Sequence, residues 1–178
     1  MKRDASAMRA SEPPAFVDGS PPIVAPRDRQ AGGAWIGASG NGLVMALSNR
    51  RGRTSTTARS RGLLLREALL SPTIPAADIF LQRETAAHEY NFFNLLAATR
   101  RELRFFRYDG QVSVTRGHEG LNVLSNEGGN VAGDPKGELI ASLLSKAPIR
   151  TVPDAVRTLQ STLRTHSAGG AVSLCNHA

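Results

Sequence analysis

Short apolar stretches alternate with polar residues along the chain, and Gly, Pro and Asn mark the ends of these stretches. The clearest case is 34–48, where Ser39-Gly40-Asn41-Gly42 separates two apolar runs. An Asn-Gly pair favours a tight turn, so this segment is predicted to be a β-hairpin. Further runs predict antiparallel strands over 90–125 and a last strand over 171–175.

Other stretches carry apolar residues at helical spacing and are bounded by prolines. They predict helices within 58–88 and within 136–165. Segment 1–33 differs, because it contains five prolines and three glycines. Such a density argues against a long helix or a central strand, so this segment is predicted to be an ordered loop or tail.

The predicted strands cluster along the chain instead of alternating one by one with helices. Clustered strands are typical of an α+β fold with an antiparallel sheet. They argue against the doubly wound parallel sheet that many nucleotide-binding proteins use.

Composition narrows the class of protein. The chain has 178 residues, of which 40% are apolar and 21% are charged, and this length suits one domain with a sizeable core. No apolar run approaches the roughly 18 residues that a membrane span needs, and no export signal follows the first residues. Cys175 is the only cysteine, which fits a reducing compartment. We therefore expect a soluble, cytoplasmic protein.

The net charge of +7 and the sequence pI of about 10.7 make nucleic acid the first partner to consider. The densest group of cations runs from Arg50 to Arg66. No aromatic residue lies between Trp35 and Phe80, whereas proteins that bind single strands place stacking rings among their cations. We therefore interpret this group as a solvated loop leading into a helix, with a bound anionic ligand as the alternative.

Signatures of several enzyme classes are missing from the sequence. Gly128 and Gly133 have the spacing of a phosphate-binding loop, but Asp134-Pro135 stands where that loop needs Lys followed by Ser or Thr. This excludes kinase and NTPase chemistry. The four histidines are scattered and no CxxC or HExxH motif occurs, so no metal site is predicted. Ser39 lies in a hairpin turn and misses the spacing of a nucleophile elbow.

What remains is a series of short polar motifs. Arg27-Asp28-Arg29-Gln30-Ala31 leads directly into Gly32-Gly33-Ala34-Trp35-Ile36-Gly37, and Phe93-Asn94-Leu95-Leu96 and Leu124-Ser125-Asn126 follow later. In order and spacing these motifs resemble the NRDE family, which is also called the transport and Golgi organization 2 family. The resemblance extends over nearly the whole chain and implies one domain over 1–178.

Proteins of this family look like N-terminal-nucleophile hydrolases, so the resemblance implies a two-sheet αββα sandwich. In that chemistry an N-terminal Cys, Ser or Thr attacks an amide carbonyl, while an Arg–Asp pair and Asn side chains stabilise the charge. By resemblance the catalytic positions are Arg3, Asp4, Asn49 and Asn126, and no residue matches the family's nucleophile. The chain begins inside the family's first motif, so the fold is expected to be incomplete at the termini.

Three functions are compatible with these observations. The leading one is intracellular handling of a small amphipathic or anionic ligand, similar to haem or acyl-CoA, since eukaryotic relatives are linked to secretion, lipid metabolism and haem trafficking. The alternative is an amide-bond hydrolase whose nucleophile this chain lacks, and a basic nucleic-acid-binding module comes third. No cofactor is expected apart from haem as a ligand. The residues expected to contact a ligand are Arg59, Arg61, Gly32, Gly33, Trp35 and Asn94.

Overall fold

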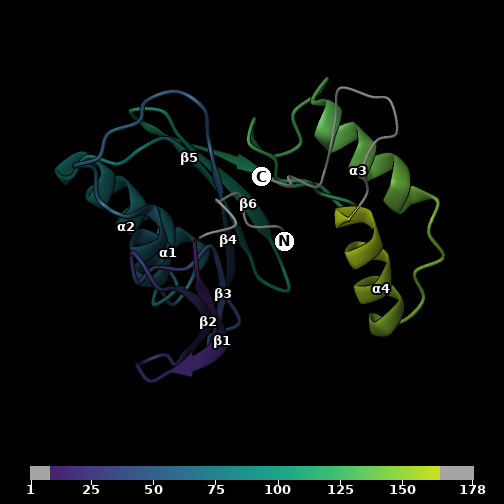
Figure 1. The fold of residues 1–178 in the computed structure, drawn as a ribbon, viewed down its shortest axis with the longest axis horizontal. Coiled ribbons are helices and arrows are strands. Elements are labelled where there is room, and N and C mark those ends of the chain that lie inside the picture. The colour runs from purple at the N-terminus through teal and green to yellow at the C-terminus, as the bar shows by residue number, and fades with distance from the viewer. Residues whose placement is uncertain (1–8, 165–178) are drawn as a thin grey trace.

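A computed structural model of the chain describes residues 9–164 (Figure 1). Within this range every strand pairs antiparallel with its neighbours in sequence, which gives one seven-stranded sheet in the order β1 to β7. The strands are β1 (Ser11–Val17), β2 (Ile23–Asp28), β3 (Ile36–Ser39), β4 (Val44–Asn49), β5 (Phe93–Ala98), β6 (Leu103–Tyr108) and β7 (Val112–Arg116). The helices are α1 (Arg61–Ala68), α2 (Ile74–Ala87), α3 (Pro135–Ser145) and α4 (Val152–Leu163).

The centre of the sheet follows the local sequence signals. The hairpin expected over 34–48 corresponds to β3 and β4, with Gly42 at a φ of +79° in its turn. Strands β4 and β5 pair over six residues although α1 and α2 lie between them in sequence. The sheet is therefore continuous although the helices interrupt its strands in sequence, and both helices lie on one of its faces.

Segment 1–33 is where the sequence prediction is wrong, because it contains β1 and β2. The two strands pair from Ser11 with Asp28 to Val17 with Ile23, with a shift in register between Glu12 and Ala15. The prolines Pro13, Pro14 and Pro26 gather at this irregularity. Pro13 and Pro14 lie in the edge strand β1, and Pro26 lies opposite the register shift, beyond the residues of β2 that pair with β3, so none of them removes a hydrogen bond from a central ladder.

The hydrophobic core lies between the sheet and α1 and α2. Met45, Leu95 and Phe106 from the sheet and Leu65 and Leu81 from the helices are fully buried in it. Helix α1 lies so close to β3 that a Cβ atom on Gly37 would be 2.5 Å from Leu69 Cδ1. Glycine at this position therefore allows the helix to contact the strand backbone.

The other face of the sheet is covered by the loop that follows β7. Gly129 lies directly on the ring of Phe105, where a Cβ atom would overlap the ring. The strand predicted over 121–125 is wrong, since only Leu124 forms an isolated bridge, to Gly129. Asn122 and Asn130 instead satisfy the backbone of this loop, with Asn130 Nδ2 donating to Asn122 Oδ1 at 2.8 Å. Side chains thus replace the strand pairing that the apolar pattern predicted.

Helices α3 and α4 form a pair on the side of the sheet opposite α1 and α2 (Figure 1). The antiparallel α+β class is confirmed, while the part of the chain that the structure describes contains one sheet where the resemblance implies two. The strand expected over 171–175 lies outside the described residues. Among residues 9–164 no helix is long and apolar enough to cross a bilayer.

Candidate functional site

A cleft of about 860 Å³ lies between the loops at one side of the sheet and the α3–α4 pair. Its polar wall comes from the loop 28–35, the segment 56–62 and the loop 121–126, which are far apart in sequence. Its opposite wall comes from both helices and is mostly apolar, with Lys136 as its charged residue beside Ile140, Leu144, Leu159 and Leu163. A cleft built in this way offers hydrogen-bonding groups at one side and hydrocarbon at the other.

Six of the residues predicted as site residues line the cleft: Asn49, Asn126, Arg59, Arg61, Gly33 and Trp35. Gly32 and Asn94 are not among its lining residues, although both contact residues that are. Arg3 and Asp4 lie outside the described residues. The sequence motifs therefore converge on one place in the fold, where local chemistry then decides what each side chain does.

Asp28 organises the loop that carries Trp35. Its backbone N–H donates to Gly33 O at 2.8 Å, and its carboxylate Oδ1 accepts from the N–H of Gln30 at 3.0 Å. The other carboxylate oxygen, Oδ2, forms an ion pair with the guanidinium of Arg9. The buried carboxylate is thus partnered on both oxygens, as a charge in a protein interior requires. Asp28 fixes the loop at the floor of the cleft.

The glycine pair joins this loop to the start of α1. A Cβ atom on Gly33 would lie 2.7 Å from Gly62 Cα, so two backbones meet here without side chains. The N–H of Ala34 donates to Gly62 O at 3.0 Å, and Arg66 donates to Gly32 O at 2.7 Å. Gly32 and Gly33, predicted to contact a ligand, also approach α1 and bring its first turn to the cleft, which Gly33 lines.

Three asparagines connect β4, β5 and the loop 121–126. Asn126 Nδ2 donates to Asn49 O at 2.6 Å, and Asn94 Nδ2 donates to Asn126 O at 2.8 Å. Asn94 is buried beneath the cleft, and its Oδ1 has no hydrogen-bond partner among the described residues. The amide of Asn126, expected to stabilise an oxyanion, makes this hydrogen bond to a backbone carbonyl. The arrangement holds the rim of the cleft against the sheet.

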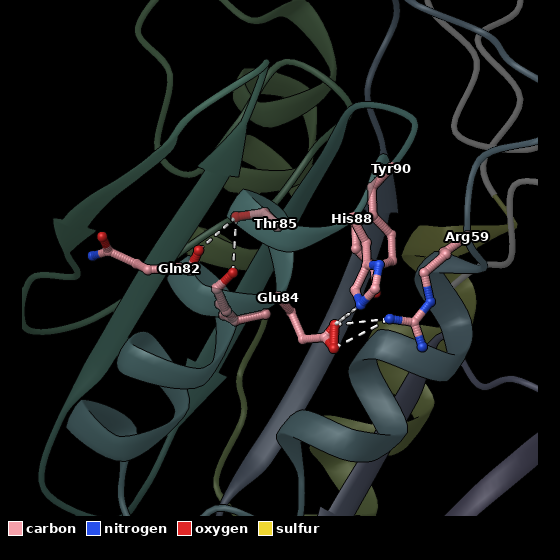
Figure 2. A network of polar contacts seen from close by, with 7 residues as sticks. Arg59, Gln82, Glu84, Thr85, His88 and Tyr90 are labelled. Carbon is pink, nitrogen blue, oxygen red and sulfur yellow. Dashed lines mark hydrogen bonds and ion pairs between the residues drawn. The ribbon is translucent and has the colours of Figure 1, made fainter.

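Arg59 enters a polar network on the outer side of α2 (Figure 2). Its Nη1 contacts Glu84 Oε2 at 2.9 Å, and its guanidinium lies over the Tyr90 ring at 6.0 Å from the centroid. Tyr90 donates to Glu84 at 3.5 Å, and His88 Nε2 lies 3.8 Å from the same carboxylate. Burial, with the Glu84 carboxylate adding to it, raises the pKa of Tyr90 from 10.0 to about 12. The charge of Arg59 is thus balanced within the protein.

Two cations line the cleft in addition to Arg9 and Arg59. Arg61 begins α1, and its Nη1 donates to Phe92 O at 2.7 Å. Lys136 lies in the first turn of α3, behind the Asp134 cap whose carboxylate accepts from the N–H groups of Lys136 and Gly137. Arg61 and Lys136 therefore place positive charge on both the sheet side and the helix side of the cleft.

Three serines of the cleft make local hydrogen bonds with their hydroxyl groups. Ser60 accepts from Leu63 N–H as the cap of α1, Ser125 accepts from Glu127 N–H at 3.0 Å, and Ser48 donates to the Asn49 carbonyl at 3.4 Å. None of these bonds involves a histidine, the base of a Ser–His pair. Within residues 9–164 there is also no group of three side chains that could hold a metal ion.

Comparison with known protein families identifies the chain. The model of the family Transport and Golgi organisation 2 matches residues 1–167. The chain belongs to this family. A search of curated proteins gives no sequence match. The family relationship inferred from the Gly32-Gly33-Ala34-Trp35 motif and its neighbours is therefore confirmed, and it extends over nearly the whole chain.

Solved structures similar to this Transport and Golgi organisation 2 member confirm the expected likeness to N-terminal-nucleophile acylases. Penicillin V acylase from Agrobacterium tumefaciens is 10% identical with a TM-score of 0.51, and the match covers 90% of this chain and 65% of that one. An N-acylethanolamine-hydrolyzing acid amidase ortholog from Caenorhabditis elegans is 14% identical with a TM-score of 0.62, covering 96% and 81%. The chain thus spans just under two thirds of the acylase's length. At these identities the likeness concerns the fold.

Three charged residues line the cleft although the sequence analysis did not predict them as site residues: Arg9, Asp28 and Lys136. Asp28 belongs to the segment that leads into the Gly-rich motif, but the prediction of a loop over 1–33 does not show that it ends strand β2. Arg9 and Lys136 carry no local signal, since the cleft brings them together from opposite ends of the described chain.

Proposed function

We propose that the cleft binds a small amphipathic ligand with an anionic head and an apolar tail, and that the protein handles this ligand inside the cell. The observation that carries the proposal is one cleft that combines a polar wall containing Arg61 with an α3–α4 wall that is apolar apart from Lys136 in the first turn of α3. Its volume of about 860 Å³ suits a small molecule or cofactor.

The cleft favours an acyl-CoA-like ligand over haem. Among its described lining residues there is no His, Cys, Met or Tyr, the side chains that usually ligate haem iron. An acyl thioester makes other demands: its phosphates attract cations and its chain needs an apolar surface. Lys136 and the leucines Leu144 and Leu159 meet both demands.

Trp35 provides the experiment, because it is the only tryptophan of the chain and lines the cleft. Titration of the protein with palmitoyl-CoA should change its fluorescence and give a dissociation constant. We expect Lys136→Gln and Leu144→Asn each to weaken binding about tenfold, through the lost charge and the lost apolar contact. Arg101→Gln, which removes an exposed cation of the β5–β6 turn outside the cleft, is the control. An unchanged emission, or equal effects of Lys136→Gln and Arg101→Gln, would contradict the proposal.

Amide-bond hydrolysis is the second candidate, and the fold likeness to an acylase and an amidase is what favours it. The reaction adds water across a C–N bond and releases a carboxylate and an amine. Incubation with penicillin V and with an N-acylethanolamine, followed by mass spectrometry of the released acids, tests it. Turnover would establish the enzyme, and intact substrates after prolonged incubation would leave ligand handling as the function.

Nucleic-acid binding receives no support from the geometry. Cations from the 50–66 region are used within the protein: Arg50 donates to Glu127 O at 2.7 Å, and Arg53 contacts Glu89 at 2.7 Å. Arg59 is held by Glu84 in the same way. A phosphate backbone would have to compete with these contacts.

A further inference from the structure

One side of α4 is apolar along the whole helix. Val152, Val156, Leu159 and Leu163 follow the spacing i, i+4, i+7 and i+11, which places them on one face. Leu159 and Leu163 line the cleft, and the stripe continues beyond it to Val156 and Val152. These two valines are 48% and 77% exposed, and Ile149 just before the helix is 44% exposed.

This exposed stripe does not hold the helical pair together. Helix α4 contacts α3, and Ala155, Thr158 and Thr162 on a neighbouring face are more buried than Val152 and Val156. Within residues 9–164 the outer part of the stripe is therefore exposed and available to a partner. Large apolar side chains grouped at one end of a helix indicate a contact surface.

Positive charge surrounds the exposed end of the stripe. Lys146 and Arg150 flank Ile149 in the connection between the helices, and both are exposed. From 139 to 164 the chain carries four cations and a single acid, Asp154. The carboxylate of Asp154 is already engaged, because it accepts from Thr151 at 2.8 Å and from Arg157 at 2.6 Å. The connection thus presents apolar side chains inside a cationic rim.

We propose that this end of the α3–α4 pair docks on an anionic lipid bilayer, with Ile149, Val152 and Val156 entering the headgroup boundary. Apolar insertion combined with Lys and Arg at the rim is how peripheral helices bind such surfaces. A protein partner fits less well, because a stable complex buries roughly 800 Å² per partner, and Ile149, Val152 and Val156 are too few side chains to supply such an area. It also lacks the aromatic residues that anchor protein interfaces.

Docking in this orientation has a consequence for the cleft. The stripe that touches lipid continues through Leu159 and Leu163 into the apolar wall. An amphipathic molecule in the bilayer would therefore meet a continuous hydrocarbon surface leading to the polar wall. The surface itself does not depend on the proposed ligand and can be tested without it.

Vesicle flotation with the full chain tests the proposal. We expect binding to phosphatidylcholine vesicles that contain about one third phosphatidylserine, and little binding to pure phosphatidylcholine. Val152→Ser with Val156→Ser should weaken partitioning about tenfold, through lost apolar insertion. Lys146→Gln and Arg150→Gln should each weaken it about fivefold and reduce its salt dependence.

The controls lie elsewhere on the surface. Ile79→Ser removes a side chain that is 63% exposed on α2, and Arg100→Gln with Arg101→Gln removes two exposed cations from the β5–β6 turn. Both variants should float as the unchanged protein does. Absence of binding to anionic vesicles, or equal loss in the controls, would overturn the proposal. A concentration-dependent dimer that the valine variant abolishes would assign the stripe to a second copy, and a lower melting temperature of that variant would assign it to the chain's own fold.

Discussion

The α1–α2 pair and the α3–α4 pair are built from similar sequence patterns but are used differently. Helices α1 and α2 bury Leu64, Leu65 and Leu81 against the sheet. Helix α3 has no buried residue, and α4 has only Thr162. One pair therefore belongs to the core, whereas the other forms the wall of a cleft.

This difference in burial places the stability of the fold and the binding of ligands in different helix pairs. A fully buried leucine contributes about 1.5–3 kcal/mol, a large share of the roughly 5–15 kcal/mol that holds a domain together. The leucines of α3 and α4 are partly solvated, so they contribute little of this free energy and remain available to a ligand or a lipid surface. Substitutions should therefore separate the two regions.

The largest contrast is expected between two leucines. Leu81→Ala in α2 removes a fully buried side chain and should lower the free energy of unfolding by about 3–5 kcal/mol, through lost burial and a cavity. Leu159→Ala in α4, where the side chain is 45% exposed, should cost less than about 1 kcal/mol and weaken palmitoyl-CoA binding instead. Urea unfolding and Trp35 fluorescence measure the two effects. Equal destabilisation would remove the distinction between the pairs.

The contact between Gly33 and Gly62 joins the core to the cleft. Gly33→Ala should cost about 1–3 kcal/mol, because the added methyl group meets the backbone of α1 and forces it to move. It should also weaken ligand binding, since the first turn of α1 lines the cleft. Gly32→Asn is the control: φ is +69° and no atom lies within 4 Å of its Cβ position, a conformation that Asn tolerates. If both variants unfold at the same urea concentration, the contact between Gly33 and Gly62 does not determine the stability.

Tyr90 extends the comparison to alkaline pH. Burial raises its pKa from 10.0 to about 12, so the unfolded chain loses this proton at lower pH than the folded protein does. The stability that neutral Tyr90 contributes is complete below pH 10 and is lost as pH rises from 10 to 12, by a total on the order of 1–2 kcal/mol. Tyr90→Phe should make this decline shallower. If the unfolding free energy of the unchanged protein and of Tyr90→Phe depends on pH in the same way, the stabilising role of neutral Tyr90 is contradicted.

Local signals in the sequence predicted much of the fold. The turn at Asn41-Gly42 and the prolines in the first turns of α2, α3 and α4 act within a few residues. These elements can therefore be predicted without knowing which distant segment packs against them. Strands β1 and β2 could not be read in this way. Their prolines argue against strands locally, and only the pairing of an edge strand with a shifted register makes them acceptable.

The candidate site was predictable as a set of motifs but not as an arrangement. Trp35 and Asn126 belong to short patterns with rare residues, and both reach the cleft. The sequence also marks Arg59 as a cation for a ligand, yet it cannot show that Glu84, 25 residues later, balances this charge. Contacts between distant segments decide which polar residue binds and which one holds the fold.

The finest test compares two helix caps of the same kind. Thr73 caps α2 by accepting from Ala76 N–H at 3.2 Å, and Thr151 caps α4 by accepting from Asp154 N–H at 3.3 Å, each two residues before a proline. Thr73→Ala should lower the free energy of unfolding by about 1 kcal/mol, because α2 is part of the core. Thr151→Ala should change it by less than about 0.5 kcal/mol and instead speed amide exchange within α4, which opens without unfolding the sheet. If amide exchange in α4 requires global unfolding, the α3–α4 pair is bound to the core as firmly as α1 and α2. This result would contradict the claim that only α1 and α2 contribute to the stability of the core.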